Sequence, residues 1–303
     1  MVEEDTEMMN KVKKSKEDRI FLAVCYIIIS ILTIIVLYPM GYVVSATFSS
    51  GSAVAQGKVW LWPVEVTLDG YKAILKYKNI WIGYRNTIFY TVVGTVINVC
   101  LTMICAYPLA RRNLRGRNAI MMLFVFTMLF NGGMIPNYIL ISKLKIINTP
   151  WAMLLPGAIS VYNMIVARTF IQQNISSELM DAAKIDGCND VQIFSQIVLP
   201  LSKAIIAVLA MWYAVGHWNS YFNAFLYLND KELYPLQIFL RELLVLGNVS
   251  SEMVDAETIA QLQNLKYLLK YTTIVIATVP LFAIYPFVQK YFVKGVMIGS
   301  VKG

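Results

Sequence analysis

Long blocks of predominantly apolar residues dominate the chain. Six such blocks occur, at 20–44, 87–110, 119–141, 151–171, 204–228 and 272–292. A helix needs about 20 consecutive apolar residues to cross the hydrocarbon core of a bilayer. Lipid offers no hydrogen-bond partner to unpaired backbone groups, so apolar blocks of this length are expected to be helical. The sequence therefore predicts an all-α membrane protein with six transmembrane helices.

The composition agrees with this interpretation. Of the 303 residues, 58% are hydrophobic and only 15% are charged, whereas soluble domains carry about 25% charged residues. The chain contains no stretch that resembles a soluble domain. We therefore expect an N-terminal tail at 1–19, a six-helix transmembrane domain at 20–292 and a C-terminal tail at 293–303.

Positive charge predicts the orientation in the membrane. The net charge is +8, and four arginines fall in the short loop 111–118 between two apolar blocks. Lysine and arginine next to a span mark its cytoplasmic side. We therefore expect a multi-pass protein of the plasma membrane, with both tails and loops 111–118 and 172–203 in the cytoplasm. Loops 45–86, 142–150 and 229–271 are then outside. No basic helix stands clear of the membrane, so the expected surroundings are lipid and not nucleic acid.

The apolar blocks lack the residues that proton coupling or catalysis would need. His217 is the only ionisable residue deep within a block, and Arg168 lies near a predicted cytoplasmic end. Proton-coupled transporters and pumps place ionisable side chains inside the bilayer. No phosphate-binding loop, serine-hydrolase elbow or histidine pair occurs. We therefore predict no catalytic residues, no metal site and no enzymatic activity, and any uphill transport must draw its energy from elsewhere.

The loop 172–203 favours a helix–turn–helix. Ser177 is the predicted N-cap of the first helix, and Gly187 can take the left-handed conformation that ends a helix. A second helix is expected at about 190–198, after which Pro200 redirects the chain into the fifth block.

The first helix of this loop has the features of a docking element. Glu178 lies in its first turn, where an acidic side chain is favourable. Ala182 and Ala183 are small, so another backbone can approach closely. The alternative interpretation is an amphipathic linker at the membrane surface.

A motif in this loop resembles one found in a known family. Permeases of binding-protein-dependent ABC importers carry Glu-Ala-Ala, three residues, Gly, nine residues, Ile, one residue and Leu-Pro in a cytoplasmic loop. This chain matches those spacings with Asp181, Ala182, Ala183, Gly187, Ile197, Leu199 and Pro200. The departure is Asp181 in place of glutamate, which keeps the charge and shortens its reach. The resemblance implies that these residues, together with Glu178, couple the chain to an ATPase.

Further stretches resemble the carbohydrate-type permeases, especially the smaller permease subunit of maltose-like importers. They are 218–222, 234–236, 289–295 and 299–303, while 131–136 resembles a branch that handles complex oligosaccharides. The likeness spans nearly the whole chain and is strongest from about residue 131.

The resemblance implies a function and a set of partners. The chain would be the membrane-spanning permease subunit of an ATP-driven ABC importer of a sugar, an oligosaccharide. It would pair with a second, homologous permease, while two cytoplasmic ATPase subunits bind ATP and Mg²⁺. An external solute-binding protein would deliver the sugar, and this chain would hold no cofactor. The resemblance also places the tail residues Gly299, Lys302 and Gly303 against the ATPases.

Two other functions stay open on the residues alone. A self-contained secondary transporter or channel for a small polar solute is the main alternative, disfavoured by the lack of buried charge and of a repeated half. A membrane enzyme is a weaker one, because no cluster of acids, bases or metal ligands is visible in the loops.

The sugar path is expected to use polar and aromatic residues at mid-membrane depth. Amides can hydrogen bond to sugar hydroxyls, and aromatic rings can support the apolar faces of sugar rings. The candidates are Asn131, Tyr162, Asn163, Trp218, Asn219, Tyr221 and Asn223. The alternative for each residue is a role in packing between helices, which polar side chains commonly have in membranes.

Overall fold

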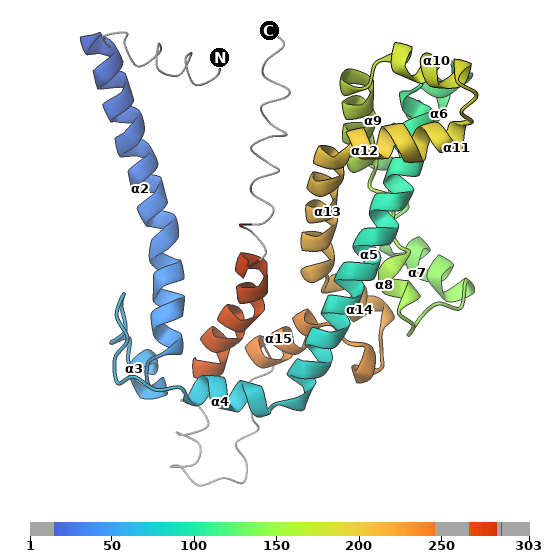
Figure 1. Cartoon of the computed structure of the whole chain (residues 1–303). Coiled ribbons are helices and arrows are strands. Elements are labelled where there is room, and N and C mark those ends of the chain that lie inside the picture. Colours follow the sequence, from blue (N-terminus) through green and yellow to red (C-terminus); the bar gives the residue numbers. More distant parts are fainter. Residues whose placement is uncertain (1–14, 246–266, 284–285, 287–303) are drawn as a thin grey trace. The chain divides into compact units, whose positions relative to one another are not determined.

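The fold is helical throughout the described part of the chain (Figure 1). The computed structural model describes residues 15–245, 267–283 and 286, and these residues contain helices and loops without any strand. The described residues divide into two compact units, the first formed by 15–72 and 267–275, the second by 73–245, 276–283 and 286. The predicted all-α class is confirmed.

The first unit contains one long apolar helix, α2 (Lys16–Thr47). Ser15 begins it with a capping box, in which its hydroxyl accepts from the backbone N–H of Glu17 and its own N–H donates to Asp18. This arrangement satisfies N–H groups that the first turn would leave unpaired. α2 is long and apolar enough to cross a membrane, as predicted for block 20–44.

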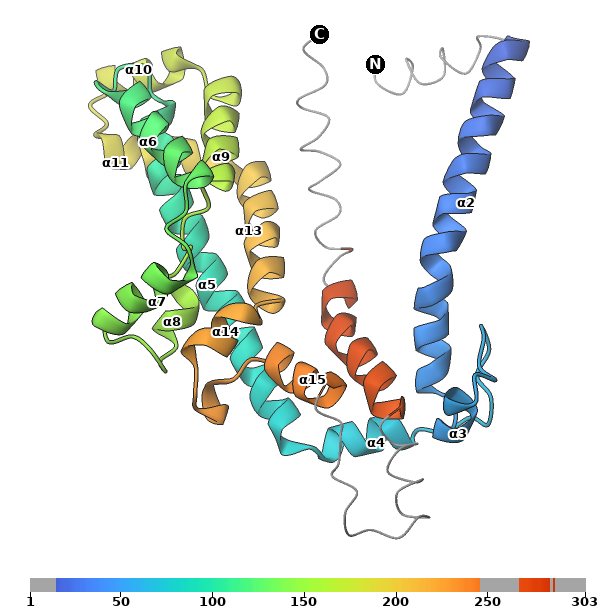
Figure 2. The same ribbon diagram turned by 180° about the vertical axis from the view of Figure 1, so that it is seen from behind.

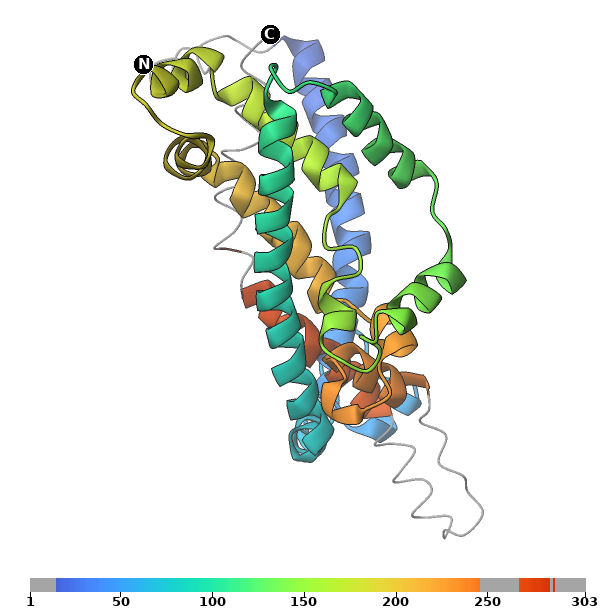
Figure 3. The same cartoon turned by 90° about the vertical axis from the view of Figure 1, so that its right-hand side faces the viewer.

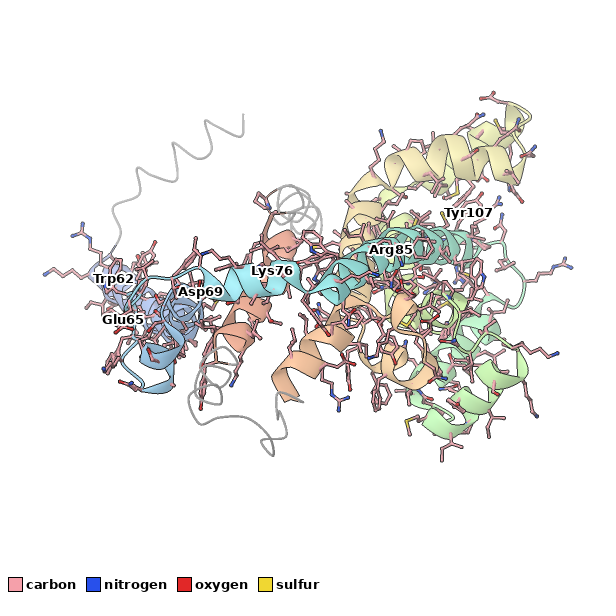
Figure 4. All side chains as sticks on the ribbon, turned by 90° about the horizontal axis from the view of Figure 1, so that it is seen from below. Trp62, Glu65, Asp69, Lys76, Arg85 and Tyr107 are labelled. Carbon is pink, nitrogen blue, oxygen red and sulfur yellow. The ribbon has the colours of Figure 1, made fainter. Side chains whose placement is uncertain are left out.

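A small core follows α2 in the same unit. It contains buried residues from the end of α2, from α3 (Gly51–Ala55) and from the start of the last described helix, 267–283: Ala46, Ala53, Val54, Val59 and Leu268. The chain then passes through the segment that carries Trp62 and Glu65 to reach α4 (Asp69–Lys76) (Figure 4). A Cβ atom on Gly70 would lie 2.5 Å from Oγ1 of Thr272, so α4 and the last helix pack closely there.

The second unit is built around α5 (Lys78–Ala110), the second helix that is long and apolar enough to cross a membrane. α9 (Val161–Asn174), α13 (Lys203–Trp218) and α15 (Leu236–Val245) pack against it (Figures 1 and 3). Polar contacts join α5 to α13: the hydroxyls of Thr102 and Tyr213 lie 2.7 Å apart.

His217 on α13 packs directly onto α5. Its Nε2 lies 3.1 Å from Nδ2 of Asn98, and a Cβ atom on Gly94 would come within 2.4 Å of the same nitrogen. The imidazole is therefore a packed, hydrogen-bonded group between two helices, which agrees with the absence of any accompanying carboxylate in the apolar blocks.

The third apolar block is not one straight helix. α6 (Arg117–Leu129) and α7 (Met134–Lys143) are bent by 112° at the break between them (Figure 2). In that break Oδ1 of Asn131 accepts from the N–H of Gly133 at 2.9 Å, and Gly133 has φ of +89°. Glycine adopts this conformation at low cost, so the sequence Asn-Gly-Gly allows the sharp turn.

The fourth and fifth blocks are broken as well. The fourth forms α8 (Trp151–Leu154) and α9, separated by a turn in which Gly157 has φ of +73°. In the fifth, α13 ends at Trp218 and α14 (Phe222–Tyr227) follows, before the short 3₁₀ helix η2 (Lys231–Leu233). Blocks three to five are thus each interrupted, and the break in the third lies at Asn131-Gly132-Gly133.

Because several blocks form two helices each, the number of membrane spans does not follow directly from the number of helices. Two helices, α2 and α5, could each cross a membrane alone, and two bent helix pairs could do so if each is one span. The last described helix, 267–283, is apolar and shorter. Residues 1–14, 246–266 and most of 284–303 lie outside the described part. They include most of the predicted N-terminal tail, the end of the sixth block and the whole C-terminal tail.

Candidate functional site

The segment that carries the family motif begins with α10 (Ser177–Ile185). Ser176, and not the predicted Ser177, is the N-cap, and its hydroxyl accepts from the N–H of Leu179 at 3.3 Å. The difference arises because Ser176 has the extended backbone that an N-cap needs, whereas Ser177 is already helical. Glu178 lies in the first turn, as predicted.

Gly187 ends α10 in the predicted left-handed conformation, with φ of +85°. The N–H of Cys188 donates to the carbonyl of Ala183 at 2.9 Å, and the N–H of Gly187 donates to that of Lys184 at 3.0 Å. This pair of bonds is a Schellman motif, which satisfies carbonyl groups that the helix end leaves free.

The second helix of the segment starts with its own cap. Asn189 and Gln192 form a capping box, with backbone-to-side-chain bonds of 2.8 and 2.9 Å, at the start of α11 (Asp190–Gln192). The chain continues as a π-helix (Ile193–Val198) and α12 (Leu199–Leu201). The predicted helix at 190–198 is confirmed, but its wide π turns were not predicted. The bend of 80° into α13 falls just after α12.

The motif residues divide into an inner and an outer group. Ala183 is buried, and Ile197 and Leu199 are half-buried against a core shared by α5, α9, α10 and α13. Glu178, Asp181, Ala182, Gly187 and Pro200 are exposed. The inner group attaches the segment to the helix bundle. The outer group lies on the surface of the segment that does not pack on the bundle, here called its free surface.

The free surface of the segment also carries exposed apolar side chains. Ile185 is 88% exposed at the end of α10, and Leu179 and Val191 are exposed too. A short helix with small, acidic and apolar residues side by side can form a compact contact with another protein.

A salt bridge and two aromatic rings connect the segment to α5. Arg111, directly after α5, donates to Asp190 at the start of α11. This hydrogen bond holds the pKa of Asp190 below its usual range. The Arg111 guanidinium also lies 5.5 Å from the ring of Tyr107, labelled in Figure 4, and that ring is 5.3 Å from the ring of Phe194. These contacts were not predicted from the sequence, although an arginine at the end of a span was visible.

α9 supports the same end of α5. Nε of Arg168 donates to the carbonyl of Leu109 at 2.9 Å, and Nε2 of Gln172 donates to that of Ala110 at 3.1 Å. These carbonyls belong to the last turn of α5 and have no partner within that helix. Arg168 therefore has a structural role, which sequence analysis alone did not reveal.

The proposed sugar-path residues on α9 and in the third block lie in different surroundings. Asn163 is buried, whereas Tyr162 is exposed and its ring lies 5.8 Å from that of Trp212. Asn131 lies in the break between α6 and α7.

The remaining sugar-path candidates lie around the break after α13. Trp218 is buried and its indole N–H donates to the carbonyl of Ala277 at 3.1 Å. The Asn219 amide donates to the carbonyl of Val215 at 2.9 Å, and Asn223 is half-buried on α14. Tyr221 stacks on Phe225 with 5.8 Å between ring centroids.

Two of these candidates line cavities, but not the same one. Trp218 lines an apolar groove of about 790 Å³ that includes residues of α5 and α13. Tyr221 lines a smaller cavity of about 270 Å³ together with Asn229 and Arg241. Neither of these cavities brings two of the seven candidates together. The predicted tail residues Gly299, Lys302 and Gly303 lie outside the described residues.

The comparison with known families decides the class of protein. Residues 79–298 match the family described as binding-protein-dependent transport system inner membrane component. The chain belongs to this family. It is a family of transport components and not of enzymes, and its members are inner-membrane proteins. The resemblance to permeases, inferred from the motif loop, is therefore confirmed.

Individual relatives cover nearly the whole chain. Protein LplC of Bacillus subtilis (strain 168) is 42% identical over 89% of this chain and 90% of its own length. The polygalacturonan/rhamnogalacturonan transport system permease protein YtcP of the same organism is 40% identical over 95% of this chain and 100% of its own. Among solved structures, a bacterial ABC transporter involved in the import of the acidic polysaccharide alginate matches with a TM-score of 0.82. It is 34% identical, covering 92% of this chain and 99% of that one.

Proposed function

We propose that this family member is the membrane-spanning permease subunit of an ATP-driven importer of a sugar, an oligosaccharide delivered by an external solute-binding protein. Two relatives whose names mention a carbohydrate support a sugar as the transported solute. They are YtcP and the alginate importer, and both match over almost their full lengths. The family description itself names dependence on a binding protein. Membership of this family favours the importer over a self-contained transporter or channel.

The observation that carries the proposal is the division of the motif segment into an attached half and a free half. α10 and the helix after it pack on the common core through Ala183, Ile197 and Leu199, while Glu178 and Ala182 are exposed. A rigid segment attached in this way can transmit movement from a docked ATPase to α5, α9 and α13. Coupling then consists of a difference in free energy between inward-open and outward-open states, which the ATPases bias.

The topology belongs to the proposal. We infer six spans, with α6–α7 as a broken third span, α8–α9 as the fourth, and both termini in the cytoplasm. Contacts between loops support this arrangement, because they join loops predicted to share a side. Arg111 in loop 111–118 pairs with Asp190 in loop 172–203, and Asn148 accepts from the N–H of Asn229.

The partners follow from the same inference. A second, homologous permease would complete a heterodimer. Two separate ATPase subunits would bind ATP and Mg²⁺ and dock on the coupling residues of this chain. These residues are Glu178, Asp181, Ala182, Ala183, Gly187, Ile197, Leu199 and Pro200. The tail residues Gly299, Lys302 and Gly303 would contact those ATPases. In the sugar path, the exposed Tyr162 and the Asn131 break are better placed for a ligand than the buried Trp218.

The experiment that tests the proposal compares two arginine substitutions in the complex reconstituted into proteoliposomes. Ala182→Arg places a large charged group on the free face of α10. Gln173→Arg, on an exposed position of α9, is the matched control. We expect Ala182→Arg to abolish ATP-driven uptake of labelled oligosaccharide and stimulation of ATP hydrolysis by the binding protein, while membrane insertion and the control stay normal. Uptake that continues without ATP or the binding protein would contradict the importer.

A further inference from the structure

A positively charged cavity lies beside the motif segment. Its volume is about 580 Å³, and it lies between the turn that follows α5, the end of α9 and α10. Five cationic side chains and one carboxylate line it: Arg111, Arg112, Arg117, Arg168, Lys184 and Asp181. Apart from Asp181, the residues that line it are not among the coupling residues proposed above.

Most of this positive charge has no ion-pair partner among the residues that the structure describes. Arg111 is paired with Asp190, and Arg168 donates Nε to a backbone carbonyl. Arg112, Arg117 and Lys184 form no ion pair within residues 15–245, 267–283 and 286. A cavity of this kind attracts an anion, and arginine favours phosphate because its planar fork can donate two parallel hydrogen bonds.

The cavity overlaps the surface proposed for the ATPase only at Asp181. Successive residues of an α-helix are rotated by about 100°. Ser177, Asp181 and Lys184 therefore share one face of α10, and these three line the cavity. Glu178, Ala182 and Ile185 lie on a face rotated by roughly 100° from it. A partner that docks on the free face can leave the cavity open.

The surroundings indicate a ligand with an apolar part. α6 begins at Arg117, at the edge of the cavity, and buries none of its residues. The first turns of this helix expose apolar side chains, including Met122 at 73% and Leu123 at 66%. An anionic group in the cavity and acyl chains along α6 would satisfy both features at once.

We propose that this cavity binds the headgroup of an anionic phospholipid. Basic pockets between membrane helices at the cytoplasmic side are suited to phosphate-bearing headgroups. The cavity lies at the turn that joins α5 to α6, and in the topology proposed above, on which this inference rests, that turn faces the cytoplasm at the level of the lipid headgroups. The lipid would lie against the motif segment, so membrane composition could influence it directly.

The test measures retained lipid on the full-length protein, purified in mild detergent with whatever subunits accompany it. Native mass spectrometry follows phosphatidylglycerol and, in parallel, phosphatidylcholine. The test variant is Arg112→Gln combined with Arg117→Gln, which removes two unpaired charges. The matched control is Arg115→Gln, from the same turn but outside the cavity lining. We expect apparent affinity for phosphatidylglycerol to fall roughly fivefold per charge removed, which corresponds to about 1 kcal/mol per basic residue, and the control to bind normally.

Several outcomes would overturn the proposal. They are equal retention of phosphatidylcholine, an equal loss in Arg115→Gln, or inorganic phosphate that binds where phosphatidylglycerol does not. If the double variant keeps its lipid but loses its cytoplasmic subunits, the cavity is a protein interface. Arg112→Lys with Arg117→Lys checks folding, since it keeps the charge and must keep the lipid. None of these measurements depends on transport, so their outcome does not test the proposed importer function, which has its own experiment.

Discussion

Gly94 and Gly187 illustrate two different reasons for a glycine in this protein. At Gly187 the backbone is left-handed, with φ of +85°, and an added Cβ atom would meet nothing within 4 Å. At Gly94 the constraint is contact, because a Cβ atom would collide with the His217 ring. Substitution of Gly187 should strain the turn after α10, and substitution of Gly94 should separate α5 from α13.

The first prediction is that Gly187→Val reduces coupling without unfolding the protein. A β-branched residue in the left-handed region costs about 1 kcal/mol or more, whereas Gly187→Asn is the milder control because asparagine tolerates that region. We expect transport-coupled ATP hydrolysis to fall strongly in Gly187→Val and little in Gly187→Asn, at equal membrane content. Equal hydrolysis in wild type and Gly187→Val would remove the docking role of this turn.

The second prediction is that Gly94→Ala destabilises the bundle by about 1–3 kcal/mol, the usual cost of overpacking. Gly216→Ala is the control, because a Cβ atom there has open space on α13. Thermal unfolding of the detergent-solubilised protein should show a lower Tm for Gly94→Ala only. If both variants have the same Tm, the contact between Gly94 and His217 is not tight.

At this scale the sequence could predict backbone requirements better than contacts. The left-handed Gly187 was predictable because glycine after a helical run is a local signal. The N-cap was misplaced by one residue, since Ser176 and Ser177 are chemically equivalent and only the backbone distinguishes them. The pairing of Arg111 with Asp190 was not predictable, because the two residues are far apart in the sequence and meet only after α5 and α11 have packed.

Among the elements, the motif segment was predicted more accurately than the spans. Its caps and turn are encoded by neighbouring residues such as Asn189 and Gln192, which act over one turn of helix. The run Asn131-Gly132-Gly133 indicated a break in the third block, whereas the breaks within the fourth and fifth blocks were not predicted, because hydropathy averages over a window and does not register where an apolar helix bends. Gly133 and Gly157 mark two of these breaks, but glycine is also tolerated within membrane helices.

The third prediction concerns the salt bridge that joins α11 to the end of α5. The hydrogen bond from Arg111 lowers the pKa of Asp190. A carboxyl whose pKa is lower in the folded state stabilises the protein above its unfolded pKa, and this contribution is lost as pH falls through the folded value. Because the Asp190 side chain is 68% exposed, we expect the salt bridge to contribute less than about 1 kcal/mol to the free energy of unfolding.

Thermal unfolding of Asp190→Asn across the acid range tests this contribution. The variant should melt slightly below wild type at neutral pH, and the difference should disappear in acid. Asp186→Asn, which removes an exposed carboxylate at the other side of the turn, should match wild type throughout. A difference for Asp190→Asn that persists in strong acid would show that the charge is not its cause.

For the whole molecule, the orientation is the property most open to a direct test. On a background without the four native cysteines, Lys184→Cys should resist a membrane-impermeant maleimide in intact cells and react after permeabilisation. Lys231→Cys, in the loop predicted to lie outside, should react in intact cells. Strong labelling at position 184 from outside would contradict the proposed topology.

A further prediction is that the C-terminal tail acts on the ATPases. Deleting 297–303 leaves every apolar block intact, so insertion and assembly should continue while uptake and ATP hydrolysis decline. A tail of the same length made only of Gly and Ser is the control for length, and it should not restore activity. Wild-type transport by the truncated protein would mean that the tail is a passive chain end, which is the default for termini.

The Schellman turn and the capping box that frame Gly187 have a thermodynamic consequence. Both ends of the short connection between α10 and α11 are closed by hydrogen bonds within the chain itself, so the segment is ordered before any partner arrives. Its binding therefore carries little loss of conformational entropy. A synthetic peptide of residues 175–201 would lack the bundle that holds it and would have to fold on binding. We expect such a peptide to be a weak competitor, whereas the intact membrane protein binds as a preformed surface.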